Sequence, residues 1–164
     1  MLIPTNTAEK SPYVRFHDFD ASQIPFHDGA RVLDLCCGYG TPLVNQMGAV
    51  YEMQVVSLDY YIQNLDKIRY FSDRVQGNAI RLPFRDASFE AIFCGEMIAE
   101  NPFFQEHPEN VALLIKEISR VLMPRGLQLL ANEFVFVVPE GFQEIRRSKH
   151  FSSNKVHWAV FQKP

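Results

Sequence analysis

The stretch RVLDLCCGYG, residues 31–40, determines how the rest of the chain is interpreted. Its first six residues form a short apolar run that meets a glycine turn, which is typical of a buried strand. Gly38 and Gly40 form the turn. Thr41 and Pro42 then predict the start of a helix, with the threonine as cap and the proline in the first turn. A strand, a glycine turn and a helix together predict the first unit of an α/β fold.

Downstream, the chain alternates between predicted strands and helices. The strands are expected at 53–59, 74–79, 89–95, 127–138, 142–149 and 155–163, and the helices at 60–73 and 107–126. Pro124 and Gly126 are expected to end the longer helix. Residues 1–30 are broken by prolines and predict an irregular arm. This alternation with short connections predicts an open, mostly parallel α/β sheet.

Composition restricts the class of protein. A chain of 164 residues that is 47% hydrophobic and 21% charged fits one globular domain and excludes a disordered chain. The formal net charge of −3 creates no overall field that would recruit nucleic acid or anionic lipid. No apolar run approaches the roughly 18 residues needed to cross a bilayer, and the start of the chain lacks a signal-peptide pattern. A soluble, cytoplasmic protein is therefore expected.

An acidic residue at the end of the second predicted strand indicates which class of ligand the fold binds. Asp59 ends the second predicted strand 21 residues after Gly38, about where a carboxylate reaches ribose hydroxyls in such sheets. The glycine pair alone could be an ordinary tight turn, but the pair and the acid together favour a nucleoside-containing ligand. Leu43 stands where a dinucleotide fingerprint needs its third glycine, and the chain lacks a P-loop. A nucleotide-dependent oxidoreductase is therefore disfavoured.

Four segments in order resemble the class I S-adenosylmethionine-dependent methyltransferases. VLDLCCGYG (32–40) is similar to their glycine motif, SLDYY (57–61) to their acidic motif, GNAIRLPFRDASFEAIFC (77–94) to their third motif and fourth strand, and EISRVLMPRGLQLL (117–130) to their last helix and fifth strand. The resemblance implies a three-layer, doubly wound Rossmann-like sheet with an antiparallel C-terminal strand. It also implies one domain over 1–164, with an arm (1–30), a cofactor-binding core (31–130) and C-terminal strands (131–164).

The resemblance also implies roles for individual residues. The methionine part of S-adenosylmethionine would be held by Asp34 and by the backbone around Cys36, Gly38 and Gly40. Asp59 would accept both ribose hydroxyls, because a charged acceptor suits paired O–H donors. Tyr60 would lie against the adenine, and Asn78 and Ala79 would meet its edge. Cys94 and Gly95 would line the floor of the site at the end of the fourth predicted strand.

Two positions depart from the family pattern. Cys36 stands where the motif has its first glycine, which makes the approach of a ligand tighter. Asn78 replaces the usual aspartate, so its amide oxygen would accept from the adenine without charge assistance and the cofactor would bind less tightly. These departures keep an alternative open, namely a non-catalytic methyltransferase-like subunit or binding module that acts through a partner protein.

The sequence contains no compelling catalytic signature. Glu96 and His107 are the candidates for a base near the acceptor, against the plainer interpretations of a solvated carboxylate and of a loop histidine before a helix. Phe103 and Phe104 could form an acceptor wall or simply pack a helix. The three cysteines form no paired spacing, so no metal site is expected and buried, inert thiols are favoured.

The partner predicted first is a small-molecule methyl acceptor, and nucleic acid and membrane are not expected. The connection VVPEG, residues 137–141, looks too short for the helix that the family has there. A sheet face without this helix would leave an apolar patch, which usually marks an interface. A homodimer or a partner subunit is therefore expected to cover it.

Overall fold

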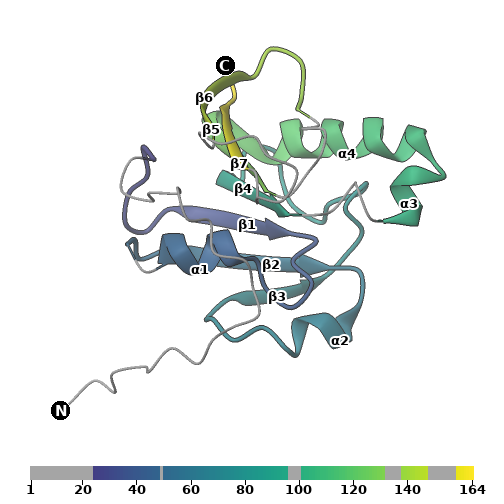
Figure 1. The fold of residues 1–164 in the computed structure, drawn as a ribbon, viewed down its shortest axis with the longest axis horizontal. Helices are drawn as coiled ribbons and strands as arrows, with labels where there is room; N and C mark the ends of the chain where they lie inside the picture. Colours follow the sequence, from purple (N-terminus) through teal and green to yellow (C-terminus); the bar gives the residue numbers. More distant parts are fainter. Residues whose placement is uncertain (1–23, 49, 96–100, 132–137, 148–157) are drawn as a thin grey trace.

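The computed structural model describes residues 24–48, 50–95, 101–131, 138–147 and 158–164, which form a seven-stranded sheet flanked by helices (Figure 1). The strands are β1 (Arg31–Leu35), β2 (Gln54–Asp59), β3 (Asp73–Gln76), β4 (Phe89–Gly95), β5 (Leu122–Ala131), β6 (Gln143–Arg147) and β7 (Trp158–Gln162). The helices are α1 (Pro42–Gly48), α2 (Ile62–Leu65), α3 (Pro102–Gln105) and α4 (Pro108–Val121).

The strand order is β3-β2-β1-β4-β5-β7-β6, with β3 at the bottom of Figure 1 and the overlapping C-terminal strands at the top. Strands β3, β2, β1, β4 and β5 pair in parallel, and β7 is antiparallel to both β5 and β6. This confirms the predicted doubly wound α/β sheet with an antiparallel C-terminal strand. The strand order reverses between β1 and β4, so a ligand site is expected at the carboxyl ends of these strands.

Two apolar layers pack on the two faces of the sheet. Helix α4 buries Leu114, Ile118 and Val121 in the first layer, where they contact β1, β4 and β5 residues. Helix α1 contributes Val44 and Met47 to the second layer. Burying one such side chain stabilises the fold by roughly 1.5–3 kcal/mol, so these apolar faces hold both helices against the sheet.

The helix predicted at 60–73 is wrong in its length, because α2 ends at Leu65. Leu65 is buried, and Ile68 is buried beyond the end of the helix, whereas Ile62 at its start is 55% exposed. Beyond Ile68 the chain turns and brings Tyr70 to the sheet, where its hydroxyl donates a hydrogen bond to Asp34. This long-range contact outweighs the weak local preference for helix.

The junction between α4 and β5 also differs from the prediction. The helix ends at Val121, before Pro124, and β5 begins at the next residue. Leu122 and Leu127 pair with β4 residues that are only two positions apart, so β5 bulges between them. Arg125 lies in the bulge with a φ of 62°, in the left-handed region. The proline and glycine therefore shape a bulge at the start of the strand rather than the end of the helix.

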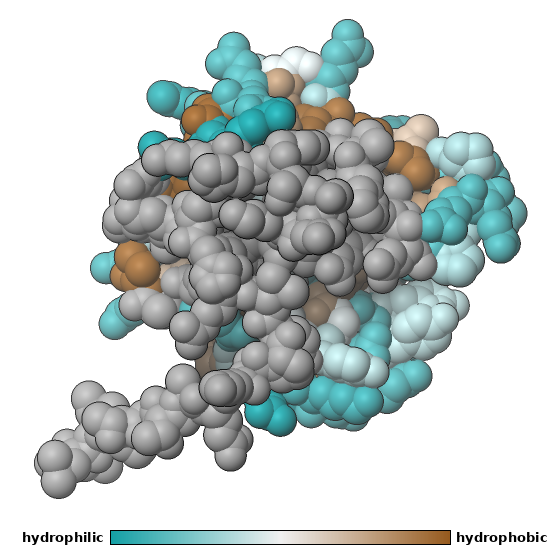
Figure 2. Space-filling model, in the orientation of Figure 1, coloured by the Kyte–Doolittle hydropathy of each residue, from teal (hydrophilic) through white to brown (hydrophobic). Residues whose placement is uncertain are grey.

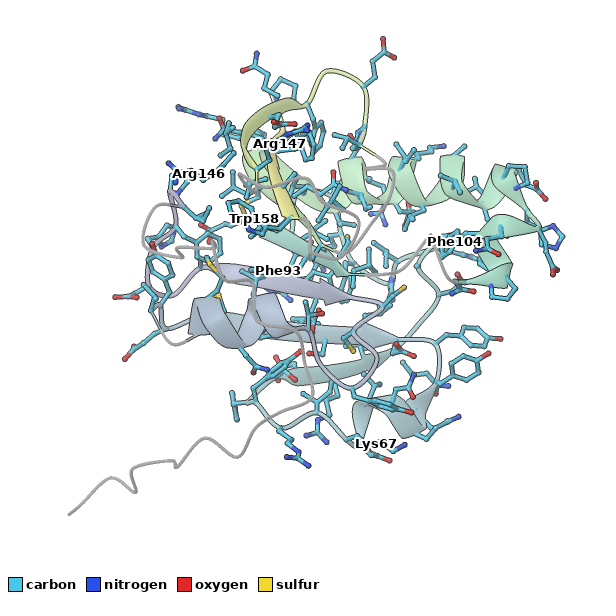
Figure 3. All side chains as sticks on the ribbon, in the orientation of Figure 1. Lys67, Phe93, Phe104, Arg146, Arg147 and Trp158 are labelled. Atoms are coloured by element: carbon cyan, nitrogen blue, oxygen red, sulfur yellow. The ribbon has the colours of Figure 1, made fainter. Side chains whose placement is uncertain are left out.

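The C-terminal part of the sheet was predicted to carry a bare apolar face. Residues 138–142, ahead of β6, are not helical, and the preceding 132–137 lie outside the described residues. The strand residues on this face are nevertheless at most 3% exposed: Leu127, Leu129, Trp158 and Val160. They share one buried layer with Phe93 of β4, which is labelled with Trp158 in Figure 3. These side chains are therefore not an exposed apolar patch, and the expected homodimer or partner subunit stays a prediction.

The surface in Figure 2 is mainly hydrophilic along the lower edge, where β3 and α2 lie. Within the described ranges, none of the helices has both the length and the apolar character that crossing a bilayer requires.

Candidate functional site

The turn between β1 and α1 is held in a strained conformation. Cys36, Gly38 and Gly40 all have positive φ, at 52°, 51° and 108°. The backbone N–H of Cys37 donates to the carbonyl of Leu58 on β2 at 3.1 Å, which ties the turn to the neighbouring strand. Cys36 therefore occupies the backbone conformation that glycine adopts most readily, at a cost of about 1–2 kcal/mol.

Asp34 lies beneath this turn and is fully buried. Its Oδ1 accepts from the Thr41 hydroxyl, and its Oδ2 accepts from the Thr41 backbone N–H at 3.3 Å and from the Tyr70 hydroxyl. Desolvation raises the pKa of Asp34 to about 6, although these hydrogen bonds oppose the rise. The carboxylate thus holds the turn and the start of α1 from below.

Asp59 is the second acidic residue of the site and is 6% exposed. Its Oδ2 accepts from the Gly38 backbone N–H at 2.9 Å, which connects the end of β2 to the glycine turn. Its Oδ1 accepts from the Tyr61 backbone N–H at 2.9 Å and from Asn64 Nδ2 at 3.0 Å. The two segments that the sequence paired, 31–40 and 53–59, therefore meet through this carboxylate.

A cavity of about 260 Å³ opens next to the carboxyl end of β2, where Tyr60 and Tyr61 line it. The predicted residues Asp34, Gly38, Gly40 and Asp59 are not among its lining residues. The cavity is slightly smaller than the roughly 300–1,000 Å³ of typical small-molecule sites, so it suits one part of a ligand, such as a flat ring. Four of its lining residues were predicted, namely Cys36, Tyr60, Asn78 and Ala79. Phe103 and Phe104 were considered as an acceptor wall, and three further lining residues were not predicted: Tyr61, Gly77 and Asn101.

The cavity is lined by aromatic rings and amides. Tyr60 is 62% exposed, and its ring packs edge-on against Tyr61 with centroids 5.3 Å apart. The Oδ1 of Asn78 accepts from the backbone N–H of Ile80 at 3.1 Å, which forms a tight turn and leaves one lone pair for a ligand. The lining contains no Asp, Glu, Lys or Arg among the described residues, so the cavity fits a neutral, planar group.

Helix α3 forms the far wall of the cavity, and the sequence analysis did not predict it. Asn101 caps it by accepting from the Phe103 backbone N–H at 3.0 Å, and Pro102 follows in the first turn. Asparagine followed by proline is a helix-start signal that could have been recognised. Phe104 is 3% exposed and packs in the core, whereas Phe103 is 41% exposed at the cavity. Figure 1 shows α2 and α3 toward the right, the end at which β1 and β2 end, and Figure 3 labels Phe104 at the same end.

The two residues expected to line the floor of the site at the end of β4 do not line the cavity. Cys94 is fully buried in the layer beneath α4, so its side chain cannot touch a ligand. Gly95 ends β4, and a Cβ added there would lie 3.8 Å from the Thr41 methyl group. Burial also raises the pKa of the Cys36 thiol to about 12 and that of Cys37 further, which agrees with inert thiols.

The structure describes one of the two candidate bases, His107, and not the other. Glu96 lies outside the described residues. His107 precedes α4, is exposed, contacts Glu109 at 3.2 Å and does not line the cavity. This agrees with the plainer interpretation of a histidine at a helix start. Among the described residues, no three His, Cys, Asp or Glu side chains come together as metal ligands.

A second cavity, of about 650 Å³, lies between α1 and the amino-terminal end of β2. Its lining includes Asn45, Glu52 and Met53. Ligands of parallel α/β sheets bind at the carboxyl ends of the strands, so the smaller cavity next to the carboxyl end of β2 is the candidate site.

Comparison with known proteins connects this site to a family. A methyltransferase-domain model matches residues 33–130. An uncharacterized methyltransferase of Synechocystis is 31% identical over 123 residues, which cover 72% of this chain and 54% of that protein. A demethylmenaquinone methyltransferase of Deinococcus radiodurans is 31% identical over 121 residues, covering 70% and 47%. The chain thus spans about half the length of these curated relatives.

Solved structures agree on the fold. A SAM-dependent methyltransferase from Methanosarcina mazei superimposes with a TM-score of 0.61 at 15% identity, covering 84% of this chain and 94% of that one. The glycine turn, the acid at the end of β2 and the cavity beside it all fall within the matched residues 33–130. The chain belongs to the class I S-adenosylmethionine-dependent methyltransferase family.

Proposed function

We propose that the protein transfers a methyl group from S-adenosylmethionine to a small-molecule acceptor. One observation carries the proposal: Asp59, at the carboxyl end of β2, has a remaining acceptor position, and the two residues that follow it, Tyr60 and Tyr61, line a neutral cavity of aromatic rings and amides. A carboxylate suits the paired hydroxyls of a ribose, and a neutral planar cavity suits an adenine.

The residues present fit this cofactor. Asp59 would hold the ribose, Tyr60 would lie against the adenine, and Asn78 and Ala79 would meet its edge. The ring of Tyr60 is exposed at the cavity and available for stacking. The turn at Cys36, Gly38 and Gly40 would hold the methionine part through its backbone. Asp34 would act indirectly, because it is buried and braces that turn.

The protein's part in the reaction is mainly to bind and align. The bound sulfonium supplies an already activated methyl group, so the chain needs to orient the acceptor and exclude water. Phe103 and Tyr61 extend from the cavity toward solvent and would shield its mouth. A general base is needed only for an acceptor that arrives protonated, and Glu96 remains the prediction for that role.

A small molecule is the favoured acceptor. The matched relatives include proteins named for demethylmenaquinone and for 27-O-demethylrifamycin SV, both small organic molecules. The cavity wall formed by α3 is aromatic, which suits an apolar or aromatic acceptor better than a charged one.

Calorimetric titration tests the cofactor. Wild-type protein should bind S-adenosylmethionine and S-adenosylhomocysteine with micromolar dissociation constants and should not bind NAD. Asp59→Ala should weaken binding by about 2 kcal/mol or more, roughly 30-fold, through the lost charge-assisted bonds. Asp73→Ala is the control, because Asp73 is an exposed acid at the start of β3.

Methyl transfer requires a separate test. Release of S-adenosylhomocysteine is measured in the presence of a panel of small phenols, quinols and amines. Turnover with one of these acceptors would support the proposed methyltransferase activity. Tight binding of the cofactor without turnover on any acceptor would favour the non-catalytic subunit, and absence of binding would overturn the proposal.

A further inference from the structure

Donors of the chain itself take up most of the hydrogen-bonding capacity of Asp59. An ionised carboxylate has about four acceptor positions, two on each oxygen. On Oδ1, both are taken by the Tyr61 backbone N–H at 2.9 Å and by Asn64 Nδ2 at 3.0 Å. On Oδ2, one is taken by the Gly38 backbone N–H at 2.9 Å. One position on Oδ2 therefore remains.

A ribose presents two neighbouring hydroxyls and thus needs two acceptor positions. The two backbone donors belong to the glycine turn and to the start of α2, so releasing them would distort the fold around the site. The Asn64 amide is the one side-chain donor of the three. It is half-buried on a helix whose neighbouring residues Ile62 and Gln63 are exposed, so a displaced amide can reach water.

We propose that Asn64 is a specificity-determining residue that competes with the ligand for Asp59. The first ribose hydroxyl takes the remaining position on Oδ2, and the second displaces the Asn64 amide from Oδ1. This inference rests on the proposed function, because it assumes that Asp59 receives a ribose. Because the Asn64 amide must be displaced first, the second ribose hydroxyl adds less binding affinity than it otherwise would. Asn64 therefore weakens the discrimination between a ribose and a deoxyribose.

The substitution Asn64→Leu tests this competition. Leucine has a similar size and donates nothing to Asp59, so the second position on Oδ1 becomes available at no cost. Affinity for S-adenosylhomocysteine should rise about fivefold, since one hydrogen bond to a charged group no longer has to be broken. The affinity for a deoxy analogue that uses only the remaining position on Oδ2 should be the same in Asn64→Leu as in the wild type. Gln63→Leu, the same change at the adjacent exposed position, is the matched control.

The experiment is a calorimetric titration of wild type, Asn64→Leu and Gln63→Leu with S-adenosylhomocysteine and its 2′-deoxy and 3′-deoxy analogues. Melting temperatures verify that each variant is folded. The expected result is that the ratio of affinities, parent over deoxy analogue, rises about fivefold in Asn64→Leu for at least one analogue and stays constant in Gln63→Leu. A purely structural role of Asn64 would change all three ligands alike and leave the ratio unmoved.

The alternative outcomes separate the two proposals. An unchanged ratio in Asn64→Leu, or weaker binding of the parent ligand, would overturn the role of Asn64 while leaving the cofactor assignment in place. Failure of the wild type to bind S-adenosylhomocysteine would overturn the proposed function and this inference with it.

Discussion

The hydroxyl of Tyr70 donates a hydrogen bond to the buried carboxylate of Asp34 from 36 positions further along the chain. The same ring approaches Gly40 so closely that a Cβ there would lie 2.8 Å from Tyr70 Cε1. Ser57 of β2 in turn donates to the Tyr70 hydroxyl at 3.4 Å. One tyrosine therefore connects β1, β2 and the glycine turn beneath the candidate site.

Tyr70→Phe should destabilise the protein more at pH 7.5 than at pH 5. The ring still packs on Gly40, so the substitution removes mainly the bond to Asp34. That bond is strongest when the carboxylate is charged, and losing it should cost about 2 kcal/mol at pH 7.5 and less at pH 5. Urea unfolding at the two pH values measures the difference. An equal loss at both would mean that the hydroxyl does not sense the charge of Asp34.

The pH dependence of stability should carry a signature of Asp34. Desolvation raises its pKa from 3.8 to about 6, so the folded chain holds this proton more tightly than the unfolded chain. Stability from this group is therefore complete below about pH 4 and is lost as the pH rises to about 6. Asp34→Asn cannot titrate and should lack this decline, whose slope reaches about 1.4 kcal/mol per pH unit. Free energies of unfolding of wild type and variant from pH 4.5 to 7 test this, and parallel curves would contradict it.

Local patterns in the sequence predicted the central elements well. Strand β4 matches its predicted span of 89–95, and β1 and β2 differ by one residue at a single end, because parallel strands buried on both faces are short apolar runs. Helix α4 was found from its apolar spacing, although its end was placed too late. Predicting β1 and β2 also predicted the positions of Asp34 and Asp59, because these two acids lie within the two strands.

The features that the sequence did not predict depend on contacts between residues far apart in the chain, which no local pattern encodes. Tyr70 leaves the expected helix because it meets Asp34, and a helical period cannot reveal such a partner. The competition of Asn64 for Asp59 appears only when the donors of one carboxylate are counted in space. Asn101 was different, because its local signal before a proline was present in the sequence and was overlooked.

Arg120 should be essential for holding the segment after Asn78 against α4. Its guanidinium donates to the carbonyls of Leu82 at 3.1 Å and Phe84 at 2.8 Å, and to Glu117 at 2.6 and 2.7 Å. Glu117 accepts in addition from the Leu82 N–H at 2.7 Å, and these bonds hold the pKa of its carboxyl below the usual range.

Arg120→Ala should therefore lower the free energy of unfolding by about 2–3 kcal/mol, because two carbonyls and the carboxylate lose their donor. Arg120→Lys should recover little of this, since an ammonium cannot reproduce the fork of donors. Asp86→Ala is the control: that acid also contacts Arg120, at 2.9 Å, but is 79% exposed, so the loss should stay below about 1 kcal/mol. Chemical denaturation of the three variants measures this ranking, and equal losses for Arg120→Ala and Asp86→Ala would refute the role of the buried contacts.

The bulge at the start of β5 offers a stabilising substitution. Arg125 is exposed and has a φ of 62°, which costs a residue with a side chain about 1–2 kcal/mol relative to ordinary backbone. Glycine adopts this conformation freely, so Arg125→Gly should raise the free energy of unfolding by about 1 kcal/mol. Arg85→Gly is the matched control at an exposed arginine outside the positive-φ group, where added backbone freedom should lower stability by about 0.5–1 kcal/mol. Thermal and urea unfolding should give opposite signs for the two variants. If Arg125→Gly destabilises as Arg85→Gly does, the left-handed conformation at the bulge is not a source of strain.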